Sequence, residues 1–292
     1  MSERNARDRG TQLRQRMIED MTVRNLSPAT QASYITAVKK FSRYYRRSPA
    51  DLGVEEVRAY QVHLVENAIA WATLNQIVSA LRFFYGITLG RADLPERIPY
   101  ARVPKTLPVV LSVAEVARLI EAIDDVVCRT ALATVYATGL RTAEVLSLRI
   151  EHIESARDLI RVEQGKGRKD RYVMLSPALL TTLRAYWKTA RPRRWLFADT
   201  DGARPISAAT LNHACMRAAL MARIGKPVTV KTLRHCFATH LLEQGTDIRI
   251  IQALLGPAQF STTARYTEVS KSLIAATRSP LDGLELKGLP AP

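Results

Sequence analysis

The run Thr232-Leu-Arg-His-Cys-Phe-Ala-Thr-His-Leu-Leu-Glu243 is the most informative stretch of this 292-residue chain. It belongs to a part of the sequence, from about residue 177 onward, in which the pattern is mostly helical. We interpret its two histidines, His235 and His240, as packing or helix-surface residues. Its arginine, Arg234, has to be considered together with three segments that lie elsewhere in the chain.

These segments, with the first run, form a recognisable set. They are Thr138-Gly-Leu-Arg141-Thr-Ala-Glu144-Val-Leu-Ser-Leu148, the turn Gly165-Lys-Gly-Arg-Lys-Asp170, and the stretch from Leu254-Leu-Gly-Pro257 to Tyr266-Thr267. Their order and spacing resemble the catalytic domain of the tyrosine recombinase (phage integrase) family, in the style of bacterial integrases and Xer-type resolvases. Leu26-Ser-Pro-Ala-Thr30, followed by Tyr34, resembles the core-binding domain of that family. The resemblance therefore covers nearly the whole chain.

The resemblance implies a site-specific DNA recombinase or integrase of a mobile element. In this family a tyrosine, here Tyr266, attacks a DNA phosphodiester and forms a 3′-phosphotyrosyl link with release of a 5′-hydroxyl. The link conserves the energy of the phosphodiester bond, so the reaction needs no metal and no other cofactor. The implied partner is double-stranded DNA, bound by a homodimer at each site and by a tetramer in the synapse.

The resemblance also assigns roles to cationic residues. Arg141 and Arg234 are expected to bind the non-bridging phosphate oxygens, where a planar guanidinium can hold two oxygens at once. Lys166 matches the lysine that protonates the leaving 5′-oxygen, and Lys169 is the fallback. Because an ordinary tyrosine has a pKa near 10, attack by Tyr266 requires a base or nearby cations.

Two positions depart from the family pattern, and both belong to the expected catalytic centre. Lys231 stands where the family has histidine, three residues before Arg234. Pro257 stands where it has histidine or tryptophan, and proline offers no side-chain donor. We hypothesise that crowding by cations and burial lower the pKa of Lys231 enough for it to act as a base.

These departures leave alternatives open. The main one is a catalytically decayed DNA-binding relative that lacks both family histidines. Another is a type IB topoisomerase with the same tyrosine chemistry, although the N-terminal resemblance argues against it. A smaller question concerns Glu144, which shares a helix face with Arg141 and either orients a catalytic side chain or forms a surface ion pair.

Composition is consistent with a nucleic-acid partner. The chain has 43 Lys and Arg against 27 Asp and Glu, a formal net charge of +16, and neutralising phosphates is the commonest use of such an excess. No apolar run approaches the roughly 20 residues of a membrane span, and we expect a cytoplasmic protein. Three widely separated cysteines suit neither a disulfide framework nor a zinc site, so we predict buried, reduced thiols.

The sequence predicts a mainly α protein with a small β element and two domains, which the resemblance implies form a C-shaped clamp. Residues 1–104 would be a helical, SAM-like core-binding domain, and residues 105–292 the catalytic domain with a β-hairpin around residues 165–170. We expect the first twenty or so residues to be loosely ordered. The proline-rich stretch Pro95–Pro108 would be a stiff, extended linker. Candidate DNA-binding residues in the first domain are Lys39, Lys40, Arg43 and Arg82.

Overall fold

The computed structural model describes residues 2–91, 93–104, 108–163 and 170–256, and also residues 277, 279 and 281. The chain divides into two compact units, residues 1–106 and residues 107–292. Each unit has its own hydrophobic core. None of the described helices is long and apolar enough to cross a membrane.

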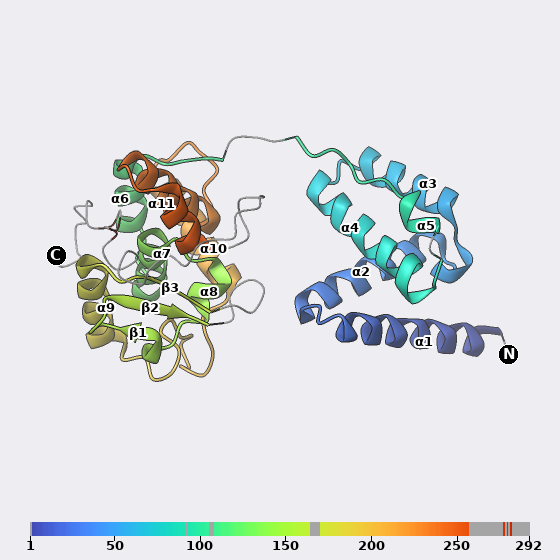
Figure 1. Ribbon diagram of the computed structural model, residues 1–292, viewed down its shortest axis with the longest axis horizontal. Helices are drawn as coiled ribbons and strands as arrows, with labels where there is room; N and C mark the ends of the chain where they lie inside the picture. The colour runs from blue at the N-terminus through green and yellow to red at the C-terminus, as the bar shows by residue number, and fades with distance from the viewer. Residues whose placement is uncertain are drawn as a thin grey trace. The chain divides into compact units, whose positions relative to one another are not determined.

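The described residues of the N-terminal unit form helices and no strand (Figure 1). Ser27 caps the second helix by accepting a hydrogen bond from the backbone of Thr30, and Pro28 occupies the first turn, so this Ser-Pro pair in the sequence is a helix start. The elements are α1 (Ser2–Val23), α2 (Pro28–Tyr45), η1 (Pro49–Asp51), α3 (Val54–Glu66), α4 (Trp71–Phe83), the π-helical turn η2 (Phe84–Thr88) and α5 (Asp93–Glu96).

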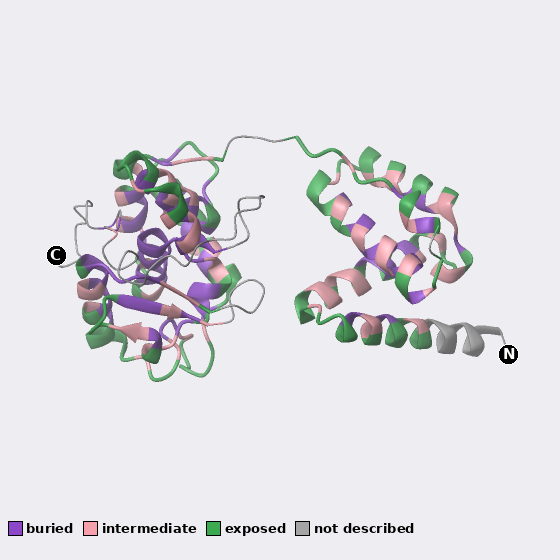
Figure 2. Ribbon diagram, viewed as in Figure 1, coloured by how far each residue is buried: buried purple, intermediate pink, exposed green. Residues whose placement is uncertain are grey.

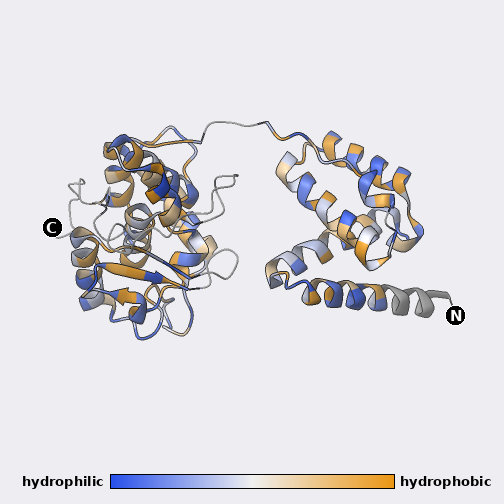
Figure 3. Cartoon of the chain, in the orientation of Figure 1, coloured by the Kyte–Doolittle hydropathy of each residue, from blue (hydrophilic) through white to orange (hydrophobic). Residues whose placement is uncertain are grey.

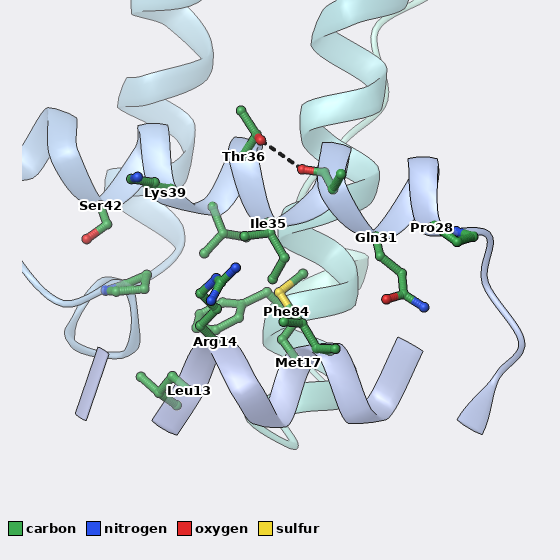
Figure 4. A pocket seen from close by; sticks show the side chains of 14 residues that line it. Leu13, Arg14, Met17, Pro28, Gln31, Ile35, Thr36, Lys39, Ser42 and Phe84 are labelled. Atoms are coloured by element: carbon green, nitrogen blue, oxygen red, sulfur yellow. Dashed lines mark hydrogen bonds between the residues drawn. The ribbon is translucent and has the colours of Figure 1, made fainter. Parts of the chain in front are cut away.

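The expectation of a loosely ordered N-terminus is wrong. Residues 2–23 form α1, and Met17 and Met21 on this helix are almost fully buried. Met17 points toward Ile35 and Phe84 across a groove between α1 and α2 (Figure 4). Residues four apart lie on one helix face, so these two methionines, with Ile18 packed against the same core, anchor the helix.

The expectation of an extended linker is wrong for its first part. Residues 93–96 form α5, and Ile98 is buried in the core of the N-terminal unit. The amide side chain of Asn75 then holds the backbone of Ala101, donating to its carbonyl oxygen at 2.9 Å and accepting from its N–H at 2.7 Å. The prolines do interrupt helices, but buried side chains and this clamp hold the chain on the unit.

In the C-terminal unit, the described residues combine helices with one small antiparallel sheet of order β1-β2-β3 (Figure 1). Ser112 and Glu115, a Ser-x-x-Glu pattern in the sequence, form a capping box at the start of α6. The described elements are α6 (Val113–Glu121), α7 (Val126–Thr138), α8 (Thr142–Leu146), η3 (Ile150–His152), β1 (Ile153–Glu154), β2 (Leu159–Val162), β3 (Arg171–Met174), α9 (Pro177–Ala190), α10 (Ala208–Met221), α11 (Val230–Glu243) and α12 (Ile248–Leu255).

Helix α7 is the centre of this unit. Almost every residue from Cys128 to Thr138 is buried, and α6, α8, α9, α10 and α11 all pack against the helix (Figure 2). A helix that is buried on nearly all sides in this way is the core of its unit. The three cysteines, Cys128, Cys215 and Cys236, are free and buried, which confirms their interpretation as core thiols.

The predicted hairpin strands pair in the expected antiparallel sense, with Ile160 opposite Val173 and Val162 opposite Arg171. Strand β2 is largely hydrophobic (Figure 3) because its side chains enter the core of the unit. The third strand, β1, was not expected from the sequence. It pairs with β2 through only two residues, which is too short to produce a recognisable alternation.

Gly139 ends α7 and allows two other helices to approach it closely. Its φ is +67°, in the left-handed region that favours glycine. A Cβ atom at this position would overlap the ring of Phe237 on α11 and would lie 2.9 Å from a methyl carbon of Leu255 on α12. The local contact of α7, α11 and α12 therefore requires a residue without a side chain.

We expect Gly139→Ala to lower the free energy of unfolding by roughly 2–5 kcal/mol, from left-handed backbone strain plus overpacking. Gly202→Ala is the matched control, because its φ is +69° and no atom lies within 4 Å of the added Cβ. Thermal and urea denaturation of both variants measure the difference. Equal losses in the two would contradict the packing argument.

Candidate active site

Arg234 lies on α11 and connects the carboxyl-terminal ends of two other helices. One Nη atom donates to the carbonyl oxygen of Gly139, at the end of α7, and the other donates to that of Leu255, the last residue of α12, at 2.8 Å. The last carbonyl groups of a helix have no partner within it and carry partial negative charge, so a cation is favourable there. The side chain is only 3% exposed.

Arg141 precedes α8 and is held by Glu144. The Arg141 backbone N–H donates to Oε2 of Glu144 at 2.8 Å, and its Nη1 donates to Oε1 at 2.7 Å. The backbone contact is the second half of a capping box, in which the third helical residue reaches back to the cap. Folding of this short helix therefore also orients the guanidinium of Arg141.

Glu144 is the common partner of the arginines. It is 7% exposed and accepts a bidentate pair from Arg171, with Nη1 to Oε1 and Nη2 to Oε2 both at 2.8 Å. Nη1 of Arg234 lies 4.0 Å from Oε2 of the same carboxylate. The surface ion pair considered for Glu144 is thus wrong, and the residue supports the two candidate catalytic arginines.

The charges of this cluster shift two pKa values. Burial alone would raise the pKa of Glu144, but the hydrogen bonds and charge of Arg171, and then the contacts with Arg141, lower it from 4.5 to about 2. Burial, followed by the positive charge of Arg141, lowers the pKa of Arg234 to about 10. Glu144 is therefore ionised and Arg234 protonated at neutral pH.

The cluster keeps unused hydrogen-bond donors. In the described part of the chain, Nη2 of Arg141 and Nε of Arg234 are buried and have no protein partner. A buried donor without a partner costs free energy, and such groups are concentrated where a ligand supplies the missing acceptor. Three guanidinium groups share one carboxylate, so the cluster remains positive and suits an anion with several oxygens.

Arg171 is a residue of this cluster that the sequence analysis did not identify as functional. It is the first residue of β3 and shares a strand face with Val173, which is completely buried. An arginine on the buried face of a strand needs an internal partner, since a charge is rarely buried alone. Its position two residues before the apolar Val173 was the available signal.

The other candidate residues from the sequence are not part of this arginine cluster in the described chain. Lys231 is exposed in the first turn of α11, so the burial that our base hypothesis requires is not supplied by the described protein. His240 is buried between Tyr136 and the carbonyl oxygen of Leu111, a packing role as predicted. The remaining candidates lie outside the described residues: Lys166, Lys169, Pro257 and Tyr266.

A metal centre finds no support in the described residues. They contain no group of three or more His, Cys, Asp or Glu side chains that could hold a metal ion.

Comparisons with known proteins agree on one family. Residues 110–272 match the profile of the Phage integrase family, and residues 13–93 match that of its N-terminal SAM-like domain. A putative integrase/recombinase, y4qK, of Sinorhizobium fredii is 45% identical over 284 residues, which are 97% of this chain and 91% of the relative. The tyrosine recombinase XerD of Shewanella oneidensis is 33% identical over 267 residues, 85% of this chain and 89% of the relative.

Solved structures show the same fold. A lambda integrase dimer bound to a COC′ core site matches with a TM-score of 0.71 at 20% identity, covering 89% of this chain and 99% of the integrase chain. A lambda integrase tetramer bound to a Holliday junction also gives 0.71, at 19% identity, covering 88% of this chain and 80% of the other.

The lowered pKa of Glu144 predicts a pH-dependent contribution to stability. A carboxyl group whose pKa is lower in the folded than in the unfolded state stabilises the fold above the unfolded value. This contribution is lost as the pH falls from about 4.5 to about 2. We expect Glu144→Gln to lower the free energy of unfolding at pH 7 by about 3 kcal/mol, and the difference from wild type to shrink over that pH interval.

Urea denaturation at a series of pH values measures this difference. Glu151→Gln is the control, because Glu151 pairs with Arg149 at 3.0 Å but is 62% exposed, and we expect a far smaller loss. A Glu144→Gln deficit that stays constant down to the lowest pH at which the protein folds would refute the electrostatic explanation.

Proposed function

This chain belongs to the phage integrase family of tyrosine recombinases and is a site-specific DNA recombinase, and we propose that it cuts and rejoins DNA strands through Tyr266. The observation that carries the proposal is the cluster of Arg141 and Arg234 around Glu144. Each of these arginines keeps a buried donor without a protein partner. Together they form a site for one phosphodiester group.

In the proposed reaction, Tyr266 gives its hydroxyl proton to water, and its oxygen attacks the phosphorus of the scissile phosphodiester. The bond to the 5′-oxygen breaks, the protein holds a 3′-phosphotyrosyl link, and the leaving oxygen takes a proton from Lys166. Arg141 and Arg234 bind the non-bridging oxygens, where negative charge grows in the transition state. The hydroxyl of another strand reverses these steps and completes the exchange.

The two altered positions change the details of this site. Lys231 is one helical turn before Arg234 and exposed, so we assign it a hydrogen bond to the same phosphate. Its use as a base requires bound DNA to bury it. Pro257 removes one side-chain donor, and loss of a single preorganised donor costs about 10²–10³ in rate in comparable sites.

The decayed relative is the less favoured alternative. Relatives that match most of the chain at 45% and 33% identity are named as an integrase/recombinase and as a tyrosine recombinase. The arginine pair and its supporting carboxylate are also complete. The match to the family's N-terminal domain at residues 13–93 likewise argues against a type IB topoisomerase.

We further propose that residues 1–104 form the core-binding domain and residues 105–292 the catalytic domain. A homodimer would occupy each DNA site and a tetramer the synapse, in the cytoplasm. The lambda integrase structures support the assembly, because one is a dimer on a core site and another a tetramer on a Holliday junction. A mobile element is the proposed source of the DNA sites.

Helix α2 is the proposed phosphate-binding surface of the core-binding domain. Lys39, Lys40 and Arg43 are all exposed, opposite the buried Val38 and Phe41. We also include Arg82, which has an internal role as well. It donates to the carbonyl oxygen of Ile98 at 2.9 Å, and its guanidinium carbon lies 5.0 Å from the centre of the Tyr100 ring.

Trapping on a suicide substrate tests the cleavage chemistry. A nicked duplex that carries the attachment site loses its short strand after attack, so the covalent protein–DNA product accumulates. We expect a covalent band for the wild-type protein on a denaturing gel and none for Tyr266→Phe, which lacks the nucleophile.

The residues that depart from the family pattern supply the control. We expect Lys231→His with Pro257→His to retain or increase the rate of band formation. Native DNA complexes without any covalent band in wild type, but with a band in this double variant, would establish the decayed alternative instead.

The salt dependence of DNA binding tests α2. Each phosphate contact adds about 0.9 to the slope of log K against log salt, so we expect Arg43→Ala to lower that slope by about 0.9. Arg58→Ala is the control, because Arg58 is exposed on α3 and pairs with Glu55 at 3.8 Å. An equal fall in slope for both variants would indicate a general charge effect rather than contact through α2.

A further inference from the structure

We propose that Arg171 is a positioning residue that holds Arg141, the end of α12 and the start of β3 in one fixed geometry. This inference rests on the proposed function, since it concerns the same site. Arg171 itself would touch neither the phosphate nor the tyrosine. It would act through Glu144 and through the main chain of Leu254.

The hydrogen bonds of Arg171 favour positioning over phosphate binding. Its Nε donates to the carbonyl oxygen of Leu254 at 3.0 Å, and its two Nη atoms donate to the two carboxylate oxygens of Glu144 at 2.8 Å. All three nitrogen atoms are thus engaged within the protein. Arg141 and Arg234, by contrast, each keep a buried nitrogen with no protein partner in the described chain.

These contacts connect three segments that are distant in the sequence. Arg171 begins β3, directly after the segment that carries Lys166. Leu254 lies in the last turn of α12, from which the chain continues toward Tyr266. Glu144 holds Arg141 at the start of α8. One side chain therefore relates the segments of the proposed proton donor, the proposed nucleophile and a phosphate ligand.

The end of α12 is built closely against this arginine. Gly256 has a φ of +75°, and a Cβ atom at that position would lie 3.4 Å from both Cδ and Nε of Arg171. The glycine thus turns the chain away from the helix while its backbone lies beside the arginine. A shift of Arg171 would break its hydrogen bond to Leu254, two residues before this exit.

Glu144 accepts from Arg141 and Arg171 through the same two oxygens, so the two arginines fix each other. Without Arg171, only the two contacts of Arg141 itself and the more distant Arg234 hold the carboxylate, so the position of the Arg141 guanidinium is less well defined. Displacement of a reacting or binding group by about 1 Å costs on the order of 10²-fold in rate. A lysine at position 171 cannot restore the arrangement, because it has one point donor in place of a planar fork.

The test compares Arg171→Met, Arg171→Lys and Arg129→Met in the full-length protein. Arg129 is the matched control, since it is a half-buried arginine of the same unit whose Nε donates to the carbonyl oxygen of Ile123 at 2.7 Å. We expect Arg171→Met to slow formation of the covalent band by about 10- to 100-fold. Arg171→Lys should recover only part of that loss, and Arg129→Met should change the rate by less than about threefold.

The pH profile separates positioning from loss of stability. Glu144 faces Arg141 beside α8, Arg171 on β3 and Arg234 on α11, while α12 contributes only carbonyl oxygens to the cluster. Arg171 is the largest influence that lowers the pKa of Glu144, and burial raises it. In Arg171→Met the pKa of Glu144 should rise, so this carboxylate becomes protonated at a higher pH than in wild type. The cleavage rate of the variant should therefore fall with decreasing pH over a range where the wild-type rate is constant. Adding Glu144→Gln should remove this extra dependence.

A second measurement requires no cleavage activity. In protein labelled with ¹⁵N-arginine and free of DNA, the guanidinium of Arg141 should give a resolved, ordered Nε–H signal in wild type. The signal should become exchange-averaged in Arg171→Met and remain unchanged in Arg129→Met. An ordered Arg141 signal in Arg171→Met would overturn the inference. So would a cleavage rate and pH profile of Arg171→Met that equal those of wild type, measured below the melting temperature of the variant.

The covalent band and the NMR signal of Arg141 distinguish failure of the proposed cleavage from failure of the proposed role of Arg171. If wild-type protein forms no covalent band, the proposed cleavage fails, and the Arg141 signal alone decides whether Arg171 positions it. If wild type cleaves and Arg171→Met cleaves equally well at every pH, the cleavage proposal stands and the role of Arg171 is refuted.

Discussion

Three arginine side chains can lie together in the C-terminal unit because a single buried carboxylate, Glu144, lies among them. Like charges at short range repel strongly in a medium of low polarity, and each guanidinium also loses water on burial. Glu144 offsets both costs through direct bonds to Arg141 and Arg171 and lies 4.0 Å from Arg234. The arrangement of the proposed phosphate-binding donors depends on this residue.

Helix ends provide the second part of the site. Arg234 binds the last carbonyl groups of α7 and α12, so the negative ends of two helices help to stabilise its charge. The three helices can approach this closely only because Gly139 has no side chain. The core packing around α7 and the electrostatics of the site therefore depend on the same contact between helices. A change in either should alter the other.

The differences between expectation and structure have local physical causes. The apolar residues of α1 are too sparse to produce a clear helical period. Met17 and Met21 are nevertheless buried and hold the helix against its neighbours. The proline-rich stretch after α5 contains few residues that predict packing, yet Asn75 holds its backbone. In both places the deciding contacts come from elsewhere in the chain, so no window of local sequence contains them.

By itself, the sequence determined the helical nature of both units, the hairpin strands, the caps at Ser27 and Ser112, and the family. It also marked Arg141 and Arg234 as candidate phosphate ligands, because the spacing around them is distinctive. Only the tertiary structure decided that Glu144 is shared, that Arg171 belongs to the cluster and that Lys231 is exposed. Periodicity reports which face of an element is buried, whereas a partner for a buried charge is found only when distant segments meet.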